Sequence, residues 1–164
     1  MTTDTVFQMT GSHVRFGVGA TREVGSDFVD LGAKRVMLVV DPAVRELYPG
    51  QAAIESLKAA GVEYEVFDEV RCEPTDASFL QAIEVATNGD FDAFLAVGGG
   101  STIDTAKAAN LYGSWPAEFT EYVNPTLGKG TTPPGPLKPL IAVPTTAGTG
   151  SETTAVAVFD FEKE

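Results

Sequence analysis

Residues 93–107 have the sequence AFLAVGGGSTIDTAK, in which three consecutive glycines join an apolar run to a helical pattern. The apolar run contains no polar residue, which is typical of a strand buried on both faces of a sheet. Because glycine has no Cβ, the backbone N–H groups of the glycines can come close to a ligand. The start of the following helix adds unpaired N–H donors and partial positive charge. This stretch therefore predicts an anion site, suited to a phosphate or pyrophosphate, at the carboxyl end of a strand.

A tight turn that needs glycine only for packing is the alternative to an anion site. A P-loop is excluded, because no Gly-Lys-Ser/Thr follows the glycines and Lys107 lies well inside the helix. We expect Asp104 in the first turn of this helix, where a carboxylate interacts favourably with the helix dipole. Asp104 can pair with Lys107 three residues later, or it can accept a hydrogen bond from a ligand.

The same alternation of strand and helix patterns continues on both sides of this stretch. The strand patterns cover residues 36–40, 62–67, 91–97 and 139–143, and the helical patterns cover 51–60, 75–87 and 101–111. Thr75 is a good N-cap, and Gly61 stands where a helix ends in a left-handed residue. The alternation predicts an α/β fold, a Rossmann-like parallel sheet with helices on both faces.

Two stretches are less regular. Residues 113–138 contain five prolines and lead into a buried strand, so we expect a long ordered excursion rather than a linker. The run from Thr153 to Phe161 is rich in β-forming residues and then turns polar, which predicts a strand. No return strand follows it, and an unpaired edge would be a liability. This favours a truncated chain over a natural strand end.

Length and charge exclude several classes of protein. The chain has 164 residues and a net charge of −12, so a nucleic-acid backbone is not expected as a partner. No apolar run approaches the ~20 residues of a membrane span, and Met1–Gly11 lacks the pattern of a secretion signal. One cysteine, Cys72, suits a reducing compartment, and we expect the cytoplasm. One histidine, His13, leaves too few ligands for a zinc site within this chain.

Asp41 follows the strand pattern of residues 36–40 directly. A carboxylate at the end of a strand can bind both hydroxyls of an adenosine ribose and would repel a 2′-phosphate, which favours NAD over NADP. The common fingerprint places this acid after the glycines, whereas Asp41 precedes them, and a helix N-cap is the alternative role. Gly17-Val18-Gly19 lacks the third glycine of a nucleotide loop, so we interpret it as a structural turn.

A second polar loop, Pro144 to Glu152, follows the last strand pattern. Thr145, Thr146 and Thr149 supply hydroxyl groups that can donate to and accept from a polar ligand. Because this loop also leaves the end of a strand, we expect it to form a second wall of the anion site.

The two loops together resemble the iron-containing (group III) alcohol dehydrogenase family. The resemblance rests on GGGSTIDTAK at residues 98–107 and PTTAGTGSE at 144–152, in that order and spacing, and FGVG at 16–19 and VDP at 40–42 match as well. The run from Leu137 to Thr154 is most similar to the hydroxyacid-oxoacid transhydrogenase branch. The resemblance covers the whole chain but only the N-terminal half of the family's proteins.

The resemblance implies that residues 1–164 form a dinucleotide-binding α/β domain, and that a C-terminal helical domain with one Asp and three His as ligands of iron or zinc is absent. The implied cofactor is NAD, and the implied substrate is a small alcohol or hydroxyacid. By motif match, Gly99, Gly100, Ser101 and Asp104 would bind the pyrophosphate and nicotinamide side, Thr145, Thr146 and Thr149 would line the cofactor with Val158 nearby, and Asp41 would bind the adenosine ribose. One departure is Glu73, where many relatives have an asparagine.

Two other interpretations remain open at this point. One is a sugar-phosphate cyclase of the dehydroquinate synthase type, which shares the fold, although the loop at residues 144–152 matches the dehydrogenases better. The other is a stand-alone nucleotide-binding module. In either dehydrogenase or transhydrogenase, this chain alone is expected to be inactive. A domain without its partner exposes apolar surface, so we also expect a homo-oligomer.

Overall fold

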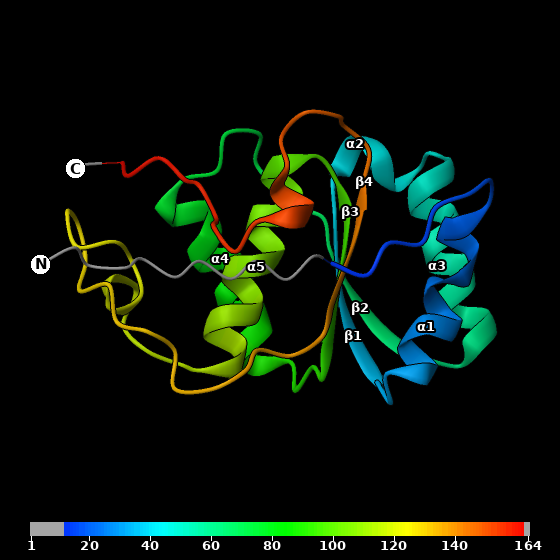
Figure 1. Cartoon of the computed structure of the whole chain (residues 1–164), viewed down its shortest axis with the longest axis horizontal. Helices are drawn as coiled ribbons and strands as arrows, with labels where there is room; N and C mark the ends of the chain where they lie inside the picture. The colour runs from blue at the N-terminus through cyan, green and yellow to red at the C-terminus, as the bar shows by residue number, and fades with distance from the viewer. Residues whose placement is uncertain (1–11, 163–164) are drawn as a thin grey trace, which may run out of the picture.

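The computed structural model describes residues 12–162, and the expectation for Met1–Gly11 lies outside them. The described chain forms a parallel sheet of four strands in the order β2-β1-β3-β4 (Figure 1). The strands are β1 (Arg35–Val40), β2 (Glu63–Phe67), β3 (Ala93–Gly98) and β4 (Leu140–Pro144). Each of the predicted strands at residues 36–40, 62–67, 91–97 and 139–143 is confirmed to within two residues.

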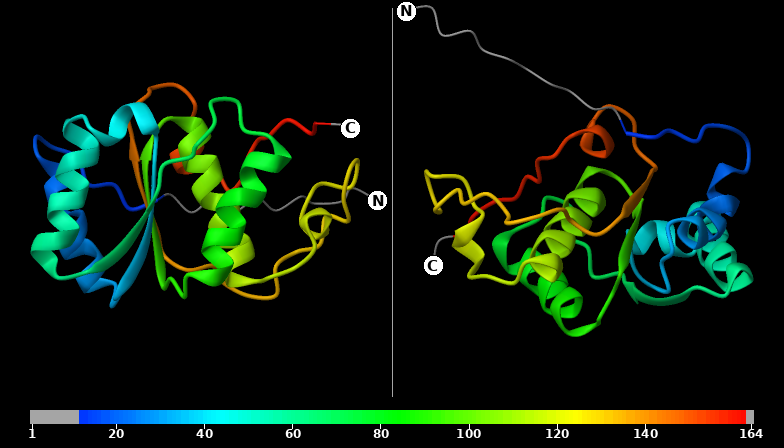
Figure 2. Two further views of the ribbon diagram at one scale, coloured as in Figure 1. Left: turned by 180° about the vertical axis from the view of Figure 1, so that it is seen from behind. Right: turned by 60° about the horizontal axis from the view of Figure 1, so that its bottom comes forward.

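Helices cover both faces of the sheet, as predicted. Helices α1 (Val24–Asp30) and α3 (Tyr48–Ala60) lie on one face, and α4 (Asp76–Asn88) and α5 (Gly100–Ser114) lie on the other (Figures 1 and 2). Shorter helical segments are α2 (Pro42–Arg45), η1 (Ala20–Glu23), η2 (Phe119–Glu121) and η3 (Ser151–Thr153).

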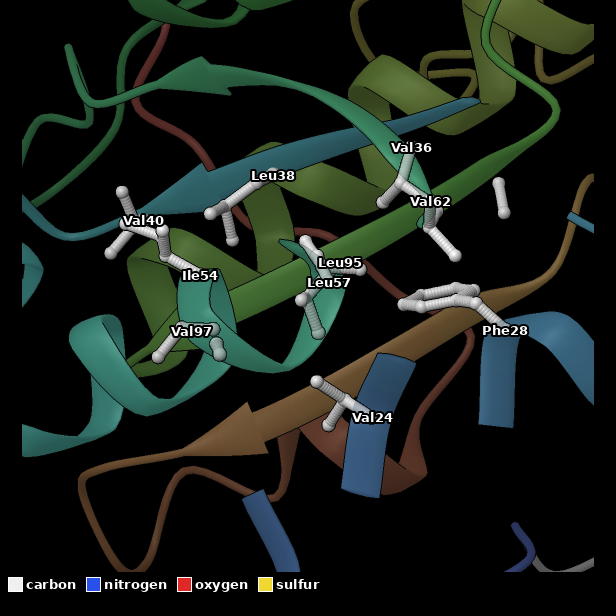
Figure 3. Packing of buried hydrophobic residues seen from close by; sticks show 12 residues of the cluster. Val24, Phe28, Val36, Leu38, Val40, Ile54, Leu57, Val62, Leu95 and Val97 are labelled. Carbon is white, nitrogen blue, oxygen red and sulfur yellow. The ribbon is translucent and has the colours of Figure 1, made fainter. Parts of the chain in front are cut away.

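The core is divided by the sheet into two apolar layers. Along β1 the side chains alternate, so that Val36, Leu38 and Val40 pack toward α1 and α3 (Figure 3), whereas Met37 and Val39 pack toward α4 and α5. All five are fully buried. A strand whose two faces are both covered needs no polar residue, which explains its continuous apolar sequence.

Local chemistry sets the helix ends. Thr75 caps α4 through a capping box with Ser78, and Gly61 ends α3 with a left-handed φ of 69°. Gly19, with φ 86°, precedes the short helix η1, so Gly17-Val18-Gly19 is the structural turn that we predicted.

The excursion over residues 113–138 is ordered by hydrogen bonds to aromatic side chains, as expected. The Tyr112 hydroxyl donates to the Phe119 carbonyl, and the Tyr122 hydroxyl donates to the Trp115 carbonyl at 3.1 Å. The Trp115 indole N–H donates to the Pro136 carbonyl at 3.2 Å. Together these bonds fold the excursion back beside the C-terminal end of α5.

The prediction of a strand over residues 153–161 is wrong. The segment is irregular apart from η3, and it forms one isolated bridge between Asp160 and Thr75. Its backbone is bonded to side chains of α5 and to the loop before α4, so its β-forming residues are not part of the sheet. No helix in the described part of the chain is both long and apolar enough to cross a membrane.

Candidate dinucleotide site at the strand ends

Three neighbouring strands bring their carboxyl ends together at one edge of the sheet. The Asp41 N–H at the end of β1 donates to Val97 O of β3 at 3.1 Å. On the other side of β3, the Thr145 N–H donates to Gly98 O at 2.9 Å. Asp41, the glycines and Thr145 are therefore adjacent across the sheet although they lie far apart in the chain.

The strand order also places a topological switch point here. From β1 the chain crosses to β2 on one side, whereas from β3 it crosses to β4 on the other side. In open α/β sheets the crevice at the carboxyl ends of two such strands is where ligands bind. In this sheet the carboxyl ends of β1 and β3 carry Asp41 and the glycine turn side by side.

The glycine turn leads straight into an uncapped helix. Gly99 is the N-cap of α5 and provides no side-chain cap, and the helix begins at Gly100. The first N–H groups of a helix have no partner within the helix. Gly99, Gly100 and Ser101 are half-buried, so the turn that carries these donors is partly accessible to solvent.

The hydroxyl-rich loop packs against the same turn. A Cβ atom at Gly99 would lie 3.1 Å from Thr146 Oγ1, and one at Gly100 would lie 3.0 Å from Thr149 Cγ2. Thr145, Thr146 and Thr149 are exposed on their outer side. The loop thus packs beside the glycine turn, and it can approach only because the turn lacks side chains. That it forms a second wall of an anion site stays a prediction.

Beneath the turn lies a buried hydroxyl group with no partner among the described residues. Thr102 is fully buried, and its Oγ1 makes no hydrogen bond. A Cβ at Gly98 would lie 2.2 Å from this oxygen, so position 98 admits glycine alone. The third residue of a helix often bonds back to the N-cap N–H, and here Thr102 does not.

Asp41 has the N-cap role that we gave as an alternative. Its Oδ1 accepts from the Ala43 N–H at 2.8 Å and so caps α2. Its Oδ2 makes no hydrogen bond within residues 12–162 and remains available to a ligand. The two roles are compatible, because a carboxylate has two oxygens that accept independently.

Asp104 differs from the expectation. Because α5 begins at Gly100, Asp104 lies in the second turn, and the first turn holds no acidic residue. Its Oδ1 accepts from Lys107 Nζ at 3.1 Å, and its Oδ2 accepts from the Val158 N–H at 3.1 Å. Lys107 Nζ also donates to Val156 O at 2.7 Å. The pair fastens the C-terminal segment to α5, with Val158 beside the helix and 66% exposed.

Three residues at this edge were not among the predicted site residues. Asp68 directly follows β2 and pairs with Arg45 at the end of α2. Glu73, in the left-handed region at φ 57°, donates its N–H to Ser101 Oγ at 3.4 Å. The position of Asp68 directly after an expected strand, like that of Asp41, was the available signal. Within residues 12–162, no three His, Cys, Asp or Glu side chains gather as metal ligands.

Known proteins are similar to this chain in both sequence and architecture. The family model described as iron-containing alcohol dehydrogenase matches residues 11–164. Hydroxyacid-oxoacid transhydrogenase, mitochondrial, of Bos taurus is 58% identical over 98% of this chain and 35% of its own length, and the Homo sapiens protein of that name is 56% identical. Crystalline 1,3-propanediol oxidoreductase superposes with a TM-score of 0.82 at 31% identity, over 96% of this chain and 40% of its own. An alcohol dehydrogenase from Oenococcus oeni superposes with a TM-score of 0.79 at 32% sequence identity, over 96% of this chain and 41% of its own.

The sheet order and the helices on both faces define an α/β domain of the doubly wound class. More particularly, the chain belongs to the iron-containing alcohol dehydrogenase family, because the family model spans nearly all of it. The match favours this family over a sugar-phosphate cyclase. The chain spans about a third of the length of the curated relatives it matches. The cytoplasmic location that we predicted is wrong, because these relatives are named as mitochondrial proteins.

Proposed function

We propose that residues 1–164 are the NAD-binding domain of an oxidoreductase, with the dinucleotide lying across the carboxyl ends of β1, β3 and β4. The observation that carries this proposal is the register of the strand ends. Asp41, Gly98 and Thr145 are adjacent through the backbone bonds that Asp41 and Thr145 donate to β3. A switch point that also carries a glycine turn and an uncapped helix start combines the features that bind a pyrophosphate.

Within this site the pyrophosphate would accept hydrogen bonds from the backbone N–H groups of Gly99, Gly100 and Ser101. Each hydrogen bond to a charged group contributes about 1.5–3 kcal/mol. The net charge of −12 repels a dianion at long range, but in physiological salt that repulsion decays over about 8 Å. Local donors therefore outweigh the overall charge.

The two walls would bind the two ends of the cofactor. On the β1 side, Asp41 Oδ2 would accept from the adenosine ribose hydroxyls. On the β4 side, the hydroxyls of Thr145, Thr146 and Thr149 would line the cofactor. Asp104 and Val158, which the family resemblance implies as contacts, would act by holding the C-terminal segment against α5, since both oxygens of Asp104 are already engaged.

The activity of the whole protein is part of the proposal. We infer hydride transfer between an alcohol or hydroxyacid and nicotinamide, with the transhydrogenase named among the relatives as the particular model. A divalent metal, iron or zinc, would polarise the alcohol oxygen, and its ligands would come from sequence outside these residues. The 164-residue chain alone would bind the cofactor and not oxidise an alcohol.

Self-association of the chain is a separate part of the proposal. It is proposed from the exposed side chains of Val14 and Phe16 (79% and 98% exposed), and sedimentation equilibrium measures it.

The test is a calorimetric titration with NAD of two proteins, the natural chain and the variant Gly100→Ala. The added methyl group would lie 3.0 Å from Thr149 Cγ2 and 3.2 Å from Ser151 Oγ, at the place where the N–H groups meet the crevice. We expect NAD to bind the natural sequence and the variant to bind at least about tenfold more weakly, through the loss of one hydrogen bond to a charged group.

A matched control is Gly113→Ala, at the far end of α5, where a Cβ would meet Ala86 Cβ at 3.1 Å. This variant introduces the same methyl group under similar crowding but away from the strand ends, so it is expected to bind NAD normally. Equal NAD affinity in the Gly100 variant and the natural chain would refute the glycine-turn assignment. Metal-dependent alcohol oxidation by the chain alone would refute the proposal that this chain binds the cofactor without oxidising an alcohol.

A further inference from the structure

The edge of the sheet beside Asp41 carries an ion pair that the site described so far does not use. Arg45, the last residue of α2, directs Nη1 to the Asp68 carboxylate. Its Nε lies 3.6 Å from the Glu46 carboxylate, which is 76% exposed. Arg45 thus has one close acidic partner and one looser partner in solvent.

The strand register places this pair next to the proposed ribose position. Val39 of β1 pairs with Phe67 of β2, so Asp68 stands beside Val40, one residue before Asp41. The Arg45 N–H donates to Asp41 O at 2.9 Å, which fixes α2 against the same strand end. Asp41, Arg45 and Asp68 therefore meet at a single corner formed by β1, α2 and β2.

The charges at this corner decide which dinucleotide it can take. A 2′-phosphate needs a cation, and an arginine fork matches phosphate geometry well. Arg45 is four residues after Asp41 but is neutralised by Asp68. With Arg45 engaged by Asp68, the corner offers a 2′-phosphate no free cation, whereas Asp41 can still accept from ribose hydroxyls.

We propose that Asp68 is a specificity-determining residue that excludes a 2′-phosphorylated dinucleotide by engaging Arg45. The proposal rests on the proposed NAD-binding function and goes beyond it, since it assigns the choice of dinucleotide to a pair of residues on α2 and β2 in addition to Asp41. A purely structural pair would fasten α2 to the sheet and leave the choice of dinucleotide unaffected.

The exposure of the pair makes the two roles separable. The side chains of Arg45 and Asp68 are 41% and 33% exposed, and exposed ion pairs contribute little to stability. The variant Asp68→Asn keeps the shape of the side chain and removes its charge, so the fold is retained. Arg45 is then free to meet an added phosphate.

The experiment is a calorimetric titration of the 164-residue chain and its variants with NAD and with NADP. We expect the natural chain to prefer NAD. Asp68→Asn should bind NADP at least about tenfold more tightly than the natural chain does, which is the effect of one charge-assisted hydrogen bond. Its affinity for NAD should change by less than about twofold. An unchanged ratio of NAD to NADP affinity in this variant overturns the proposal.

Two further variants separate the freed cation from the mere loss of a negative charge. The double variant Arg45→Gln/Asp68→Asn lacks the guanidinium and should return NADP binding to the level of the natural chain. If it keeps the gain, relief of repulsion is the cause and the proposal is overturned. Glu46→Gln removes the other acidic partner and should leave the ratio unchanged.

The outcome for the natural chain distinguishes this proposal from the function on which it rests. If the chain binds NAD and the Asp68 variant does not alter the preference, the specificity proposal fails and the NAD site stands. If the natural chain binds NADP as well as NAD, the specificity proposal fails together with the ribose role of Asp41, whereas dinucleotide binding at the glycine turn stands. If it binds neither dinucleotide, both proposals fail.

Discussion

Tyr112 is an uncharged hydrogen-bond donor held in an apolar setting. It is 4% exposed, its hydroxyl donates to Phe119 O, and its ring centroid lies 5.7 Å from that of Phe119 and 5.2 Å from that of Tyr122. Burial raises the pKa of Tyr112 to about 12 from the ordinary value of 10.0. The phenol therefore stays protonated in conditions where an exposed tyrosine has lost its proton.

The raised pKa predicts a stability change at alkaline pH. The protonated phenol stabilises the fold fully below about pH 10, and this contribution is lost as the pH rises toward about 12. In Tyr112→Phe, the unfolding free energy at neutral pH should fall by about 1 kcal/mol with the lost hydrogen bond. Its decline between pH 10 and 12 should also be shallower, as urea unfolding at several pH values will measure.

Absorbance at alkaline pH provides an independent readout. The chain has four tyrosines, and one of them should ionise well after the others in the natural protein and be missing from the titration of Tyr112→Phe. Tyr48 is exposed and serves as the matched site, because Tyr48→Phe should leave the late transition in place. The absence of a late transition in the natural protein would contradict the burial argument.

Among elements, helix α5 has two separate roles along its length. Its first turn presents N–H groups at the crevice, and its second turn fastens the C-terminal segment through Asp104 and Lys107. The side chains of this pair are 9% and 17% exposed, so removing one partner leaves a buried charge uncompensated. The segment over residues 154–158 depends on that pair for its position.

The prediction at this scale concerns Lys107→Met. The unfolding free energy should fall by about 2 kcal/mol, less than the loss for a fully buried pair, because some solvent remains. The Val158 amide, which donates to Asp104 at 3.1 Å, should exchange its hydrogen faster. Urea unfolding and hydrogen exchange measure the two effects.

The double variant Asp104→Asn/Lys107→Met is the control for charge. It removes both charges, so it should be more stable than the single lysine variant. A double variant that is less stable than either single variant would mean that shape, not charge, holds the segment. Exchange at amides of β1 should be unaffected in every case.

The elements could be predicted from the sequence where burial and capping are local. The run Val36–Val40 had to be a covered strand because it lacks any polar residue, and Thr75 and Gly61 marked helix ends. The strand prediction for residues 153–161 is wrong because β propensity reflects fit to a half-buried surface and does not require pairing in a sheet. In the structure most of these residues are exposed, and the backbone of Val156 and Val158 is bonded to Lys107 and Asp104 rather than to a strand.

The site was predictable only in part, and the reason lies in the sheet order. The glycine turn and the threonine loop carry their chemistry within a few residues, so sequence alone indicated them. The common fingerprint expects the ribose acid after the glycines, whereas here Asp41 precedes them by a long stretch of chain. Because β1 lies beside β3, Asp41 nevertheless occupies the neighbouring strand end. The Arg45–Asp68 pair depends on register across two strands, which no local pattern encodes.

For the whole molecule, net charge predicts how salt affects dinucleotide binding. The proposed site uses backbone N–H groups, whereas the molecule carries a charge of −12. Raising the ionic strength from 0.01 M to 0.15 M shortens the screening length from about 30 Å to about 8 Å, so NAD should bind about two- to fivefold more tightly. A site built on lysine and arginine would weaken instead.

Calorimetric titrations with NAD over a series of NaCl concentrations measure this trend. Uncharged adenosine is the matched ligand, since it lacks the phosphates and should be nearly insensitive to salt. A steady loss of NAD affinity with added salt would mean that an unassigned cation contacts the pyrophosphate.

The corner around Asp41, Arg45 and Asp68 is built from β1, α2 and β2. These elements belong to one continuous stretch of sequence that ends before the glycine turn begins. Recombination within the loop between β2 and α4 would therefore transfer the proposed ribose-binding corner as one continuous segment. The phosphate-holding half would stay with its own gene segment. We therefore expect chimeras joined there to exchange nucleotide preference while keeping the glycine turn of the second parent.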